Sequence, residues 1–374
     1  MLTGLDEALL HQAPITFATA TTSDHRFYDR CWVAAYDPAG GTALNVGLGV
    51  YKNMNVADGF SCIVRGDRQH NVRMSRPLRP RVDDPAVGPL RYEVIEPYRH
   101  VRIVLDDGDH RVTCHLDWRA TLPPFVEQPT RTEINGRYAT NVQRYDQPGT
   151  VDGWIAVDGE RIAVEGWFGA RDHSWGVRGG VGGFEPATGP SPLAGGFLVS
   201  WLLFRAGELG GYVQVNRDAN GNQTFLDGRL RSHDGTDDRV VVGVDQDLEF
   251  PPGSRWYRRA SLRITDDVGD IHEIDCERLC HPIVMHGAGY DAGFRDGLGL
   301  GAHRGDDVIE SDAYDLSEDG RARLLPDLEP LRALQTEQPV RLTVNGVAGV
   351  GDLTVLAVGD LSRSGIASLA EVPS

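Results

Sequence analysis

The sequence predicts an all-β protein of two domains, on the strength of three observations. Turn signals such as "DPAGG" at 37–41, "VDGE" at 157–160 and "DDVGD" at 266–270 separate short runs rich in β-branched and aromatic residues. Convincing helical periodicity is scarce. The chain has 374 residues, which is long for a single core, so two domains with room for a sizeable pocket are expected.

Composition and charge restrict the class of protein and its partners. Hydrophobic residues make up 40% and charged residues 24%, and no apolar run is long enough for a membrane helix, so stable membrane insertion is not expected. The first residues, "MLTGLDEALLHQAP", lack the basic and apolar regions of a signal peptide, which predicts a cytoplasmic protein. A net charge of −17 disfavours nucleic acid. A homodimer is compatible with the sequence.

The elements follow one another as strands with few helices. Strand-like runs at 31–36, 100–105 and 111–118 belong to an N-terminal β-domain expected over 1–148, and the polar, turn-rich segment 128–153 is its candidate connection to the second.

The second β-domain is expected over 149–325, with strand-like runs at 239–244 and 260–265. A C-terminal extension over 326–374 would contain a short helix near 327–335 and a β-hairpin over 339–359. The first dozen residues and "DDPAVGPL" at 83–90 are the other helix candidates.

The stretch "GWFGARDHSWGVRGG" at 166–180 concentrates the chemistry. On a strand, side chains alternate between two faces. Strict alternation gives one face with Ile162, Val164, Phe168, Asp172 and Ser174, and another with Glu165, Trp167, Arg171, His173 and Trp175. Glycines at 166, 169 and 176 would permit a bulge that brings the two faces toward one cavity.

An acid among apolar neighbours loses hydration in its charged form, so its pKa rises and it can donate a proton near neutral pH. Asp172 is therefore the candidate general acid, with His173 orienting or relaying its proton and Trp175 offering a π face to developing positive charge. For Trp175 with Arg178 a structural role remains open, in which the indole plugs a barrel end and the arginine stacks over it.

"GWFGARDHSWGVR" resembles the DHxWG segment of the carotenoid 1,2-hydratase (hydroxyneurosporene synthase) family and its AttH-like relatives, and segments 26–53 and 297–317 are similar to the wider group. The resemblance implies two lipocalin-like, calycin-type β-barrel domains. In the characterised hydratases it implies cofactor-free addition of water to an isoprenoid alkene. Asp172, His173, Trp175 and Gly176 match the motif.

The hydratases also use a Tyr-x-Asp arrangement, from which this chain departs. The nearest candidate is "GGYVQVN", where Tyr212 is present but Gln214 takes the place of the acid.

These observations lead to a cofactor-independent enzyme, a hydratase or dehydratase, an isomerase or a cyclase, acting on an isoprenoid (terpenoid) or polyketide-like substrate. The expected catalytic residues are Asp172, His173 and Trp175, and the expected substrate-binding residues are Trp167, Arg178, Trp201, Tyr212 and His286. Two rivals stay open: a non-catalytic lipid or steroid carrier, and a carbohydrate-active protein that uses two carboxylates.

No cofactor and no metal are expected. The segment "HEIDCERLCH" places His272, Cys276, Cys280 and His281 close together, but their spacing is not that of structural zinc sites. The five cysteines are odd in number and irregularly spaced, which favours reduced thiols over a disulfide framework.

Overall fold

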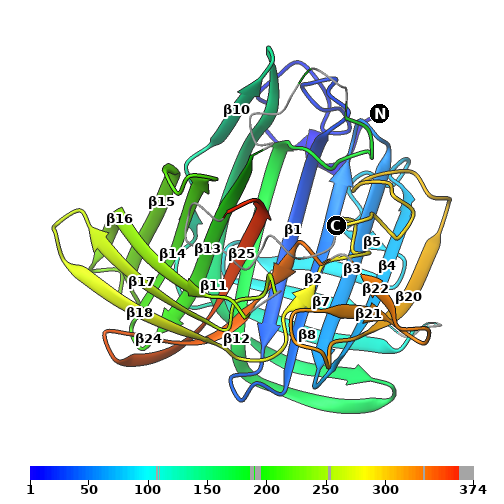
Figure 1. Ribbon diagram of the computed structural model, residues 1–374. Coiled ribbons are helices and arrows are strands. Elements are labelled where there is room, and N and C mark those ends of the chain that lie inside the picture. The colour runs from blue at the N-terminus through cyan, green and yellow to red at the C-terminus, as the bar shows by residue number, and fades with distance from the viewer. Residues whose placement is uncertain are drawn as a thin grey trace.

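The computed structural model describes residues 1–106, 108, 110–185, 189, 195–251, 254–331 and 333–361 (Figure 1). The predicted all-β, lipocalin-like fold is confirmed: within these ranges the helical structure is a single 3-10 turn, η1 (Gly4–Glu7), and the rest of the regular structure is strand. None of the described helical structure has the length and apolar character needed to cross a membrane.

The first body is one strongly curved sheet. Its central strands run in the order β20-β4-β3-β2-β1-β12-β11-β8-β7-β6. Its strands are β1 (Phe27–Tyr36), β2 (Thr42–Tyr51), β3 (Val56–Arg65), β4 (Arg68–Pro77), β5 (Ala86–Val87), β6 (Leu90–Glu96), β7 (His100–Leu105), β8 (Val112–Ala120), β9 (Phe125–Val126), β10 (Thr130–Ile134), β11 (Arg137–Val157), β12 (Glu160–Val177), β20 (Val308–Asp315), β21 (Ala322–Leu324) and β22 (Glu329–Leu331).

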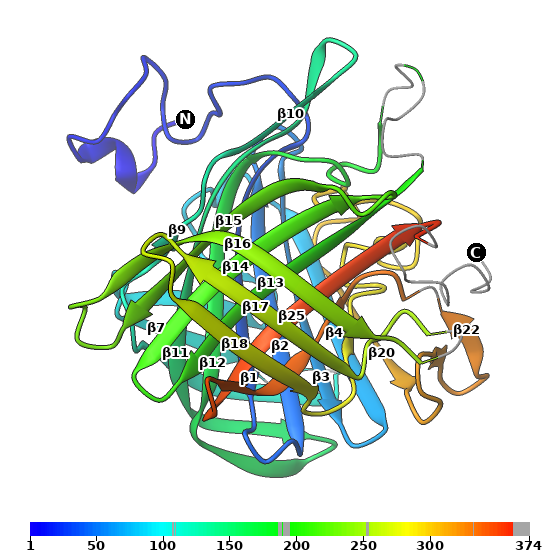
Figure 2. The same cartoon turned by 60° about the vertical axis from the view of Figure 1, so that its left-hand side comes forward.

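The second body is a closed eight-stranded barrel, which packs against the first sheet (Figure 2). Its strands are β13 (Gly196–Ala206), β14 (Leu209–Asp218), β15 (Gln223–Ser232), β16 (Asp238–Glu249), β17 (Arg259–Asp266), β18 (Ile271–Arg278), β24 (Pro339–Val344) and β25 (Val347–Gly359). Strands β19 (Ile283–Val284) and β23 (Thr336–Glu337) form a separate pair.

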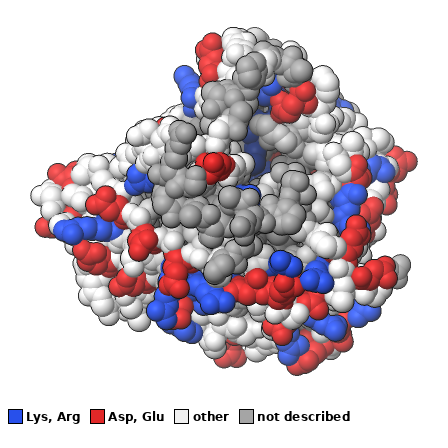
Figure 3. All heavy atoms as spheres, viewed as in Figure 1, with Lys and Arg blue, Asp and Glu red and all other residues white. Residues whose placement is uncertain are grey.

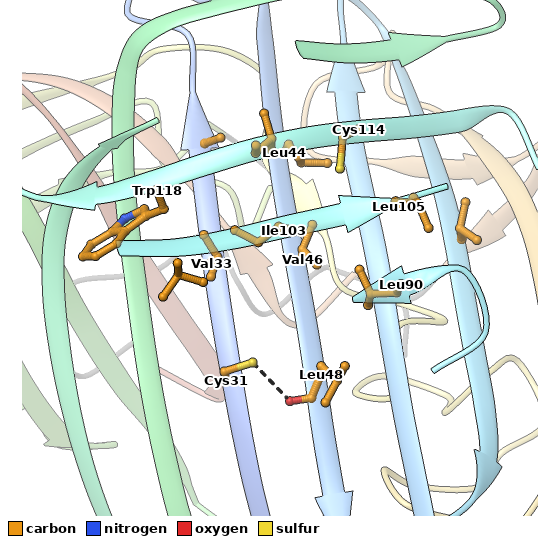
Figure 4. Close-up of a cluster of buried hydrophobic side chains, with 14 of the residues drawn as sticks. Cys31, Val33, Leu44, Val46, Leu48, Leu90, Ile103, Leu105, Cys114 and Trp118 are labelled. Carbon is orange, nitrogen blue, oxygen red and sulfur yellow. Dashed lines mark hydrogen bonds between the residues drawn. The ribbon is translucent and has the colours of Figure 1, made fainter. Parts of the chain in front are cut away.

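Strand β1 packs on both of its faces, one inside the first body and one against the barrel. Cys31, Val33 and Ala35 point into the first body, where residues of β7 and β8 such as Ile103 and Trp118 cover them (Figure 4). The alternating residues of β1, beginning with Trp32, belong to a different core that also contains residues of the barrel. Both faces of the strand are buried from Cys31 to Tyr36, which is why residues 31–36 form a continuous apolar run.

Several expected boundaries differ from the pairing. Residue 148 lies inside β11, and the change from the first sheet to the barrel comes after β12. Strands β20 and β21 return to the edge of the first sheet at β4, although they fall within the expected second domain, and β22 of the expected C-terminal extension pairs with β21.

The short helix expected near 327–335 is wrong, because the described part of that segment contains β22 and Pro330 pairs with Arg323 of β21. "DDPAVGPL" is likewise no helix, since it contains β5 and the turn into β6. Strands β24 and β25 form an antiparallel hairpin over 339–359.

A bulge in β12 changes the expected faces. The register with β11 shifts between Val151 and Gly153, and the N–H of Gly166, at φ +62°, donates to Asp152 Oδ1 at 2.8 Å. Val164 therefore shares a core with Trp167, so the expected grouping of Ile162 and Val164 with Phe168 is wrong. After the bulge the alternation holds.

Candidate functional site

A cavity of about 410 Å³ lies between the first sheet and the barrel. Strands β1, β11 and β12 contribute to one wall, and β13, β14 and β25 contribute to the wall opposite. The lining residues are Tyr28, Trp32, Glu127, Thr130, Thr140, Val142, Arg144, Asp172, Arg178, Gly179, Val199, Trp201, Gln214, Tyr290, Gln335, Glu337, Thr354 and Leu356. Its volume is within the usual range of small-molecule sites.

Asp172 lies on β12, the strand between β1 and β11 in the sheet wall. It pairs in register with Trp32 of β1 and with Asp146 of β11. Its Oδ2 lies 3.4 Å from Arg144 Nε, and a fifth of its side chain remains accessible. Burial raises the pKa of Asp172, while the Arg144 guanidinium opposes the rise.

Two further carboxyl groups, those of Glu127 and Asp146, lie near Arg144. Glu127 Oε1 is 3.5 Å from Arg144 Nη1 and accepts from Trp201 Nε1 at 3.3 Å. Burial and the Glu127 carboxylate raise the pKa of Asp146, which favours its neutral form. Arg144 thus joins Glu127 and Asp172 into one charged group beside the indole of Trp201.

Glu337 faces the cavity from β23, beside the barrel. Burial, with Asp352 as a neighbouring charge, raises the pKa of Glu337 to about 8. Thr354 Oγ1 donates to Glu337 Oε2 at 2.5 Å, and the Tyr36 hydroxyl donates to Asp352. Burial also raises the pKa of Asp352, to about 6. The Asp172 charge contributes to the rise at Glu337, so these two cavity carboxyls influence each other.

His173 points away from this cavity. Its Nε2 lies 2.7 Å from Asp29 Oδ1, and its Nδ1 lies 3.3 Å from the Tyr145 hydroxyl. These groups line a different cavity of about 270 Å³, on the inner side of the first sheet. Trp175 is 38% exposed and packs edge-on against His173, with ring centroids 5.3 Å apart. The expected relay from His173 to Asp172 is therefore not formed.

The expected substrate-binding residues divide into two groups. Arg178 and Trp201 line the cavity, and Trp201 meets Trp32 edge-on with centroids 6.2 Å apart. Trp167 is buried in the core of the first body, and His286 lies against the ring of Tyr314.

Tyr212 is buried in the core between the first sheet and the barrel, where its hydroxyl donates to Asp227. Asp227 lies on β15 directly opposite Gln214.

Sequence reasoning missed most of the polar residues of the site, namely Glu127, Arg144, Asp146 and Glu337. The segment 128–153 reads as a polar connection, but it forms β10 and the first part of β11. Val142, Arg144 and Asp146 are spaced by two and share one face of β11, which was the available signal. Glu337 had no such signal, because it reaches the cavity through the pairing of β23 with β19.

The arrangement favours proton transfer in a cavity with aromatic walls. Among the residues that the structure describes, no three His, Cys, Asp or Glu side chains are grouped to hold a metal ion. Cys276 belongs to the barrel core and Cys280 packs at the boundary between the two bodies, so the two thiols lie in different clusters.

The chain matches one family model, whose function is unknown, and its fold is similar to that of a solved structure. A family model described as "Family of unknown function (DUF8625)" matches residues 2–367. No curated protein matches the chain. The crystal structure of a "putative AttH" from Nitrosomonas europaea has a TM-score of 0.56 and 12% identity, covering 93% of this chain and 99% of that one. This likeness concerns the fold alone.

The crystal structure of CghA is more distant, with a TM-score of 0.43 and 13% identity over 90% of this chain and 89% of that one.

Proposed function

We propose, for a chain that belongs to the DUF8625 family of unknown function, a cofactor-independent enzyme that transfers protons on a hydrophobic substrate. The observation that carries the proposal is the placement of Asp172 and Glu337, two carboxyl groups with raised pKa values, in one cavity beside Trp32 and Trp201. The reaction class is hydration or dehydration, isomerisation, or cyclisation of an isoprenoid or polyketide-like molecule.

The two carboxyl groups suit different steps. Glu337, with a pKa raised to about 8, holds its proton at neutral pH and is the better donor. Asp172 lies 3.4 Å from Arg144, which favours its carboxylate and fits it to accept a proton from a substrate carbon or from water. In hydration, the alkene takes the Glu337 proton, and the water that adds to the cation loses one to Asp172.

The walls supply the remaining stabilisation. A carbocation formed by protonation is stabilised by the indole rings of Trp32 and Trp201, and the Asp172 carboxylate stabilises a cation that forms next to it. This donor assignment differs from the sequence-based one, in which Asp172 gives the proton. The variants Asp172→Asn and Glu337→Gln distinguish the two assignments.

The lipid or steroid carrier is the alternative, and it uses the same cavity without chemistry. A carrier needs apolar walls, whereas ionisable groups are costly to bury without a role or a partner. Glu337 and Asp352 are buried carboxyl groups with raised pKa values, and among the described residues neither forms an ion pair, which favours an enzyme on that ground.

Turnover distinguishes the two. Terpenoid and polyketide-type alkenes, with aryl glycosides as a third class, are incubated with the protein in deuterated water and analysed by mass spectrometry. The enzyme is expected to add or remove water, or to exchange deuterium into carbon positions, in the first two classes. Saturable binding with no mass change in any ligand supports the carrier. Release of the aryl alcohol supports the carbohydrate-active rival.

A further inference from the structure

The carboxyl groups of the cavity and its Arg178 lie at different levels along the strands. Asp172 pairs with Trp32, whereas Gly176, four residues farther along β12, pairs with Tyr28. At roughly 3.3 Å per residue, four residues separate the Trp32 level from the Tyr28 level by about 13 Å. Arg178 follows the end of β12 beyond the Tyr28 level, so the acids lie toward one end of the cavity and this arginine toward the other.

Arg178 is held by aromatic rings. Its guanidinium carbon lies 5.7 Å from the ring centroid of Tyr28 and the same distance from that of Tyr290. Contact through the flat face of a guanidinium leaves its N–H edges available for a planar anionic group. Among the described residues no carboxylate forms an ion pair with Arg178, whereas Arg144 has Glu127 and Asp172.

Two further donors on the same wall have no acceptor within the part of the chain that the structure describes. They are the Tyr28 hydroxyl and the Trp32 Nε1, and both side chains are more than nine-tenths buried and line the cavity. On the same strand, Arg30 uses Nη1 for Tyr51 and Asp58, and its buried Nε and Nη2 have no hydrogen-bond acceptor among the residues that the structure describes. Buried donors in native proteins are normally satisfied, so this wall calls for ligand oxygens.

We propose that the substrate is an amphiphile with an anionic oxygen group, a carboxylate or an acidic enol, that is held by Arg178 and the Tyr28 hydroxyl. Its apolar part then extends along Trp32 and Trp201 to Asp172 and Glu337. This inference rests on the proposed function, since it names the substrate class of the same cavity. A pure hydrocarbon of similar shape would leave both donors and the arginine unpaired.

Matched ligands test the assignment. Farnesoic acid and methyl farnesoate have nearly the same shape and differ in charge. Their binding to the full chain is measured by calorimetry and by quenching of tryptophan fluorescence, with dodecanoic acid and its methyl ester as a second pair. At pH 8 the acid of at least one pair is expected to bind at least tenfold tighter than its ester.

The variants assign the preference to the two residues. Arg178→Gln is expected to weaken the acid about tenfold and leave the ester unchanged. Arg161→Gln is the matched control, because the guanidinium of Arg161 also lies over an aromatic ring, 4.3 Å from the ring centroid of Trp154, but does not line the cavity. Tyr28→Phe keeps the ring against Arg178 and removes only the hydroxyl, so it should weaken the acid by a smaller factor, and it serves if Arg178→Gln does not fold.

Equal binding of acid and ester in both pairs, failure of both acids to bind, or an acid preference that survives both Arg178→Gln and Tyr28→Phe would overturn the inference. The proposed function is tested separately, because Asp172→Asn should keep the acid preference. If the preference holds while Asp172 and Glu337 variants turn over normally, the ligand class stands and the assigned chemistry fails.

Discussion

Asp172 and His173 are neighbours in the chain but serve opposite sides of β12. Asp172 lies 3.4 Å from Arg144 in the cavity against the barrel, whereas His173 lies 2.7 Å from Asp29 on the inner side of the first sheet. The "DHSWG" stretch is therefore two local structures on one strand, because consecutive strand residues point to opposite faces and the bulge lies earlier, at Gly166.

Asp172→Asn is expected to lower turnover about a hundredfold to ten-thousandfold, the usual cost of losing an acid or base. Asparagine has nearly the same shape and can still bond to Arg144, so the thermal midpoint should change little. Turnover and midpoint are measured on the same preparation. An unchanged rate would remove Asp172 from the mechanism, and a collapsed midpoint would make it a structural anchor.

His173→Phe is expected to have the reverse effect, a lower thermal midpoint with nearly unchanged turnover. The ring still packs against Trp175 and Tyr145, but the bond to Asp29 is lost, so the thermal midpoint should fall by a few degrees. Turnover should stay within about threefold of the parent, because the imidazole does not line the cavity. A loss as large as that of Asp172→Asn, at an unchanged midpoint, would restore the expected relay.

The fold was predictable because its signals are local. Turn residues and apolar runs mark the strands, and the two-sided burial of β1 appears as the apolar run over residues 31–36. The pairing partners were not predictable in this way. Strand β20 pairs with β4 across more than two hundred residues, and no local pattern specifies which sheet edge it completes.

The same distinction between local signals and strand pairing applies to the residues of the site. The position of Asp172 in the cavity follows from alternation and from its apolar neighbours. The pairing of Arg144 with Asp172 depends on the register of β11 against β12, and Glu337 reaches the cavity through a strand pair two residues long. The direction of His173 was not predictable from its place next to Asp172, because adjacent strand residues point to opposite faces, and His173 contacts Asp29 instead.

Gly176 gives a test of the motif as a structural element. Its φ is +132°, and a Cβ there would lie 2.1 Å from the Asn141 carbonyl oxygen of β11. Gly176→Ala is expected to lower the free energy of unfolding by about 2–4 kcal/mol through backbone strain and steric overlap. Urea denaturation measures this change.

Gly166→Asn is the control for this substitution. Gly166 also has a positive φ, +62°, but it faces open space, and asparagine tolerates that conformation. Equal losses in the two variants would contradict the steric explanation.

The raised pKa of Glu337 predicts how stability and activity depend on pH. Burial and the Asp352 charge raise the pKa of Glu337 from the ordinary 4.5 to about 8, so between these values the folded protein keeps a proton that the unfolded chain has lost. This contribution to stability is complete below about pH 4.5 and disappears as the pH rises through 8. The thermal midpoint should therefore fall by several degrees between pH 5 and pH 9.

Glu337→Gln removes this titration, so its midpoint should depend less steeply on pH and should exceed that of the parent at pH 9. Part of the slope will remain, because the pKa of Asp352 is also raised, to about 6. Glu160→Gln is the control: Glu160 is exposed, and its bond to Arg65 lowers its pKa below this window, so the slope should be unchanged. In the parent, kcat/KM should decline above pH 8 as the donor ionises, and Glu337→Gln should lose most turnover at every pH. If the parent instead keeps full activity at pH 9 while Asp172→Asn is inactive, Glu337 is not the donor, and the assignment returns to Asp172.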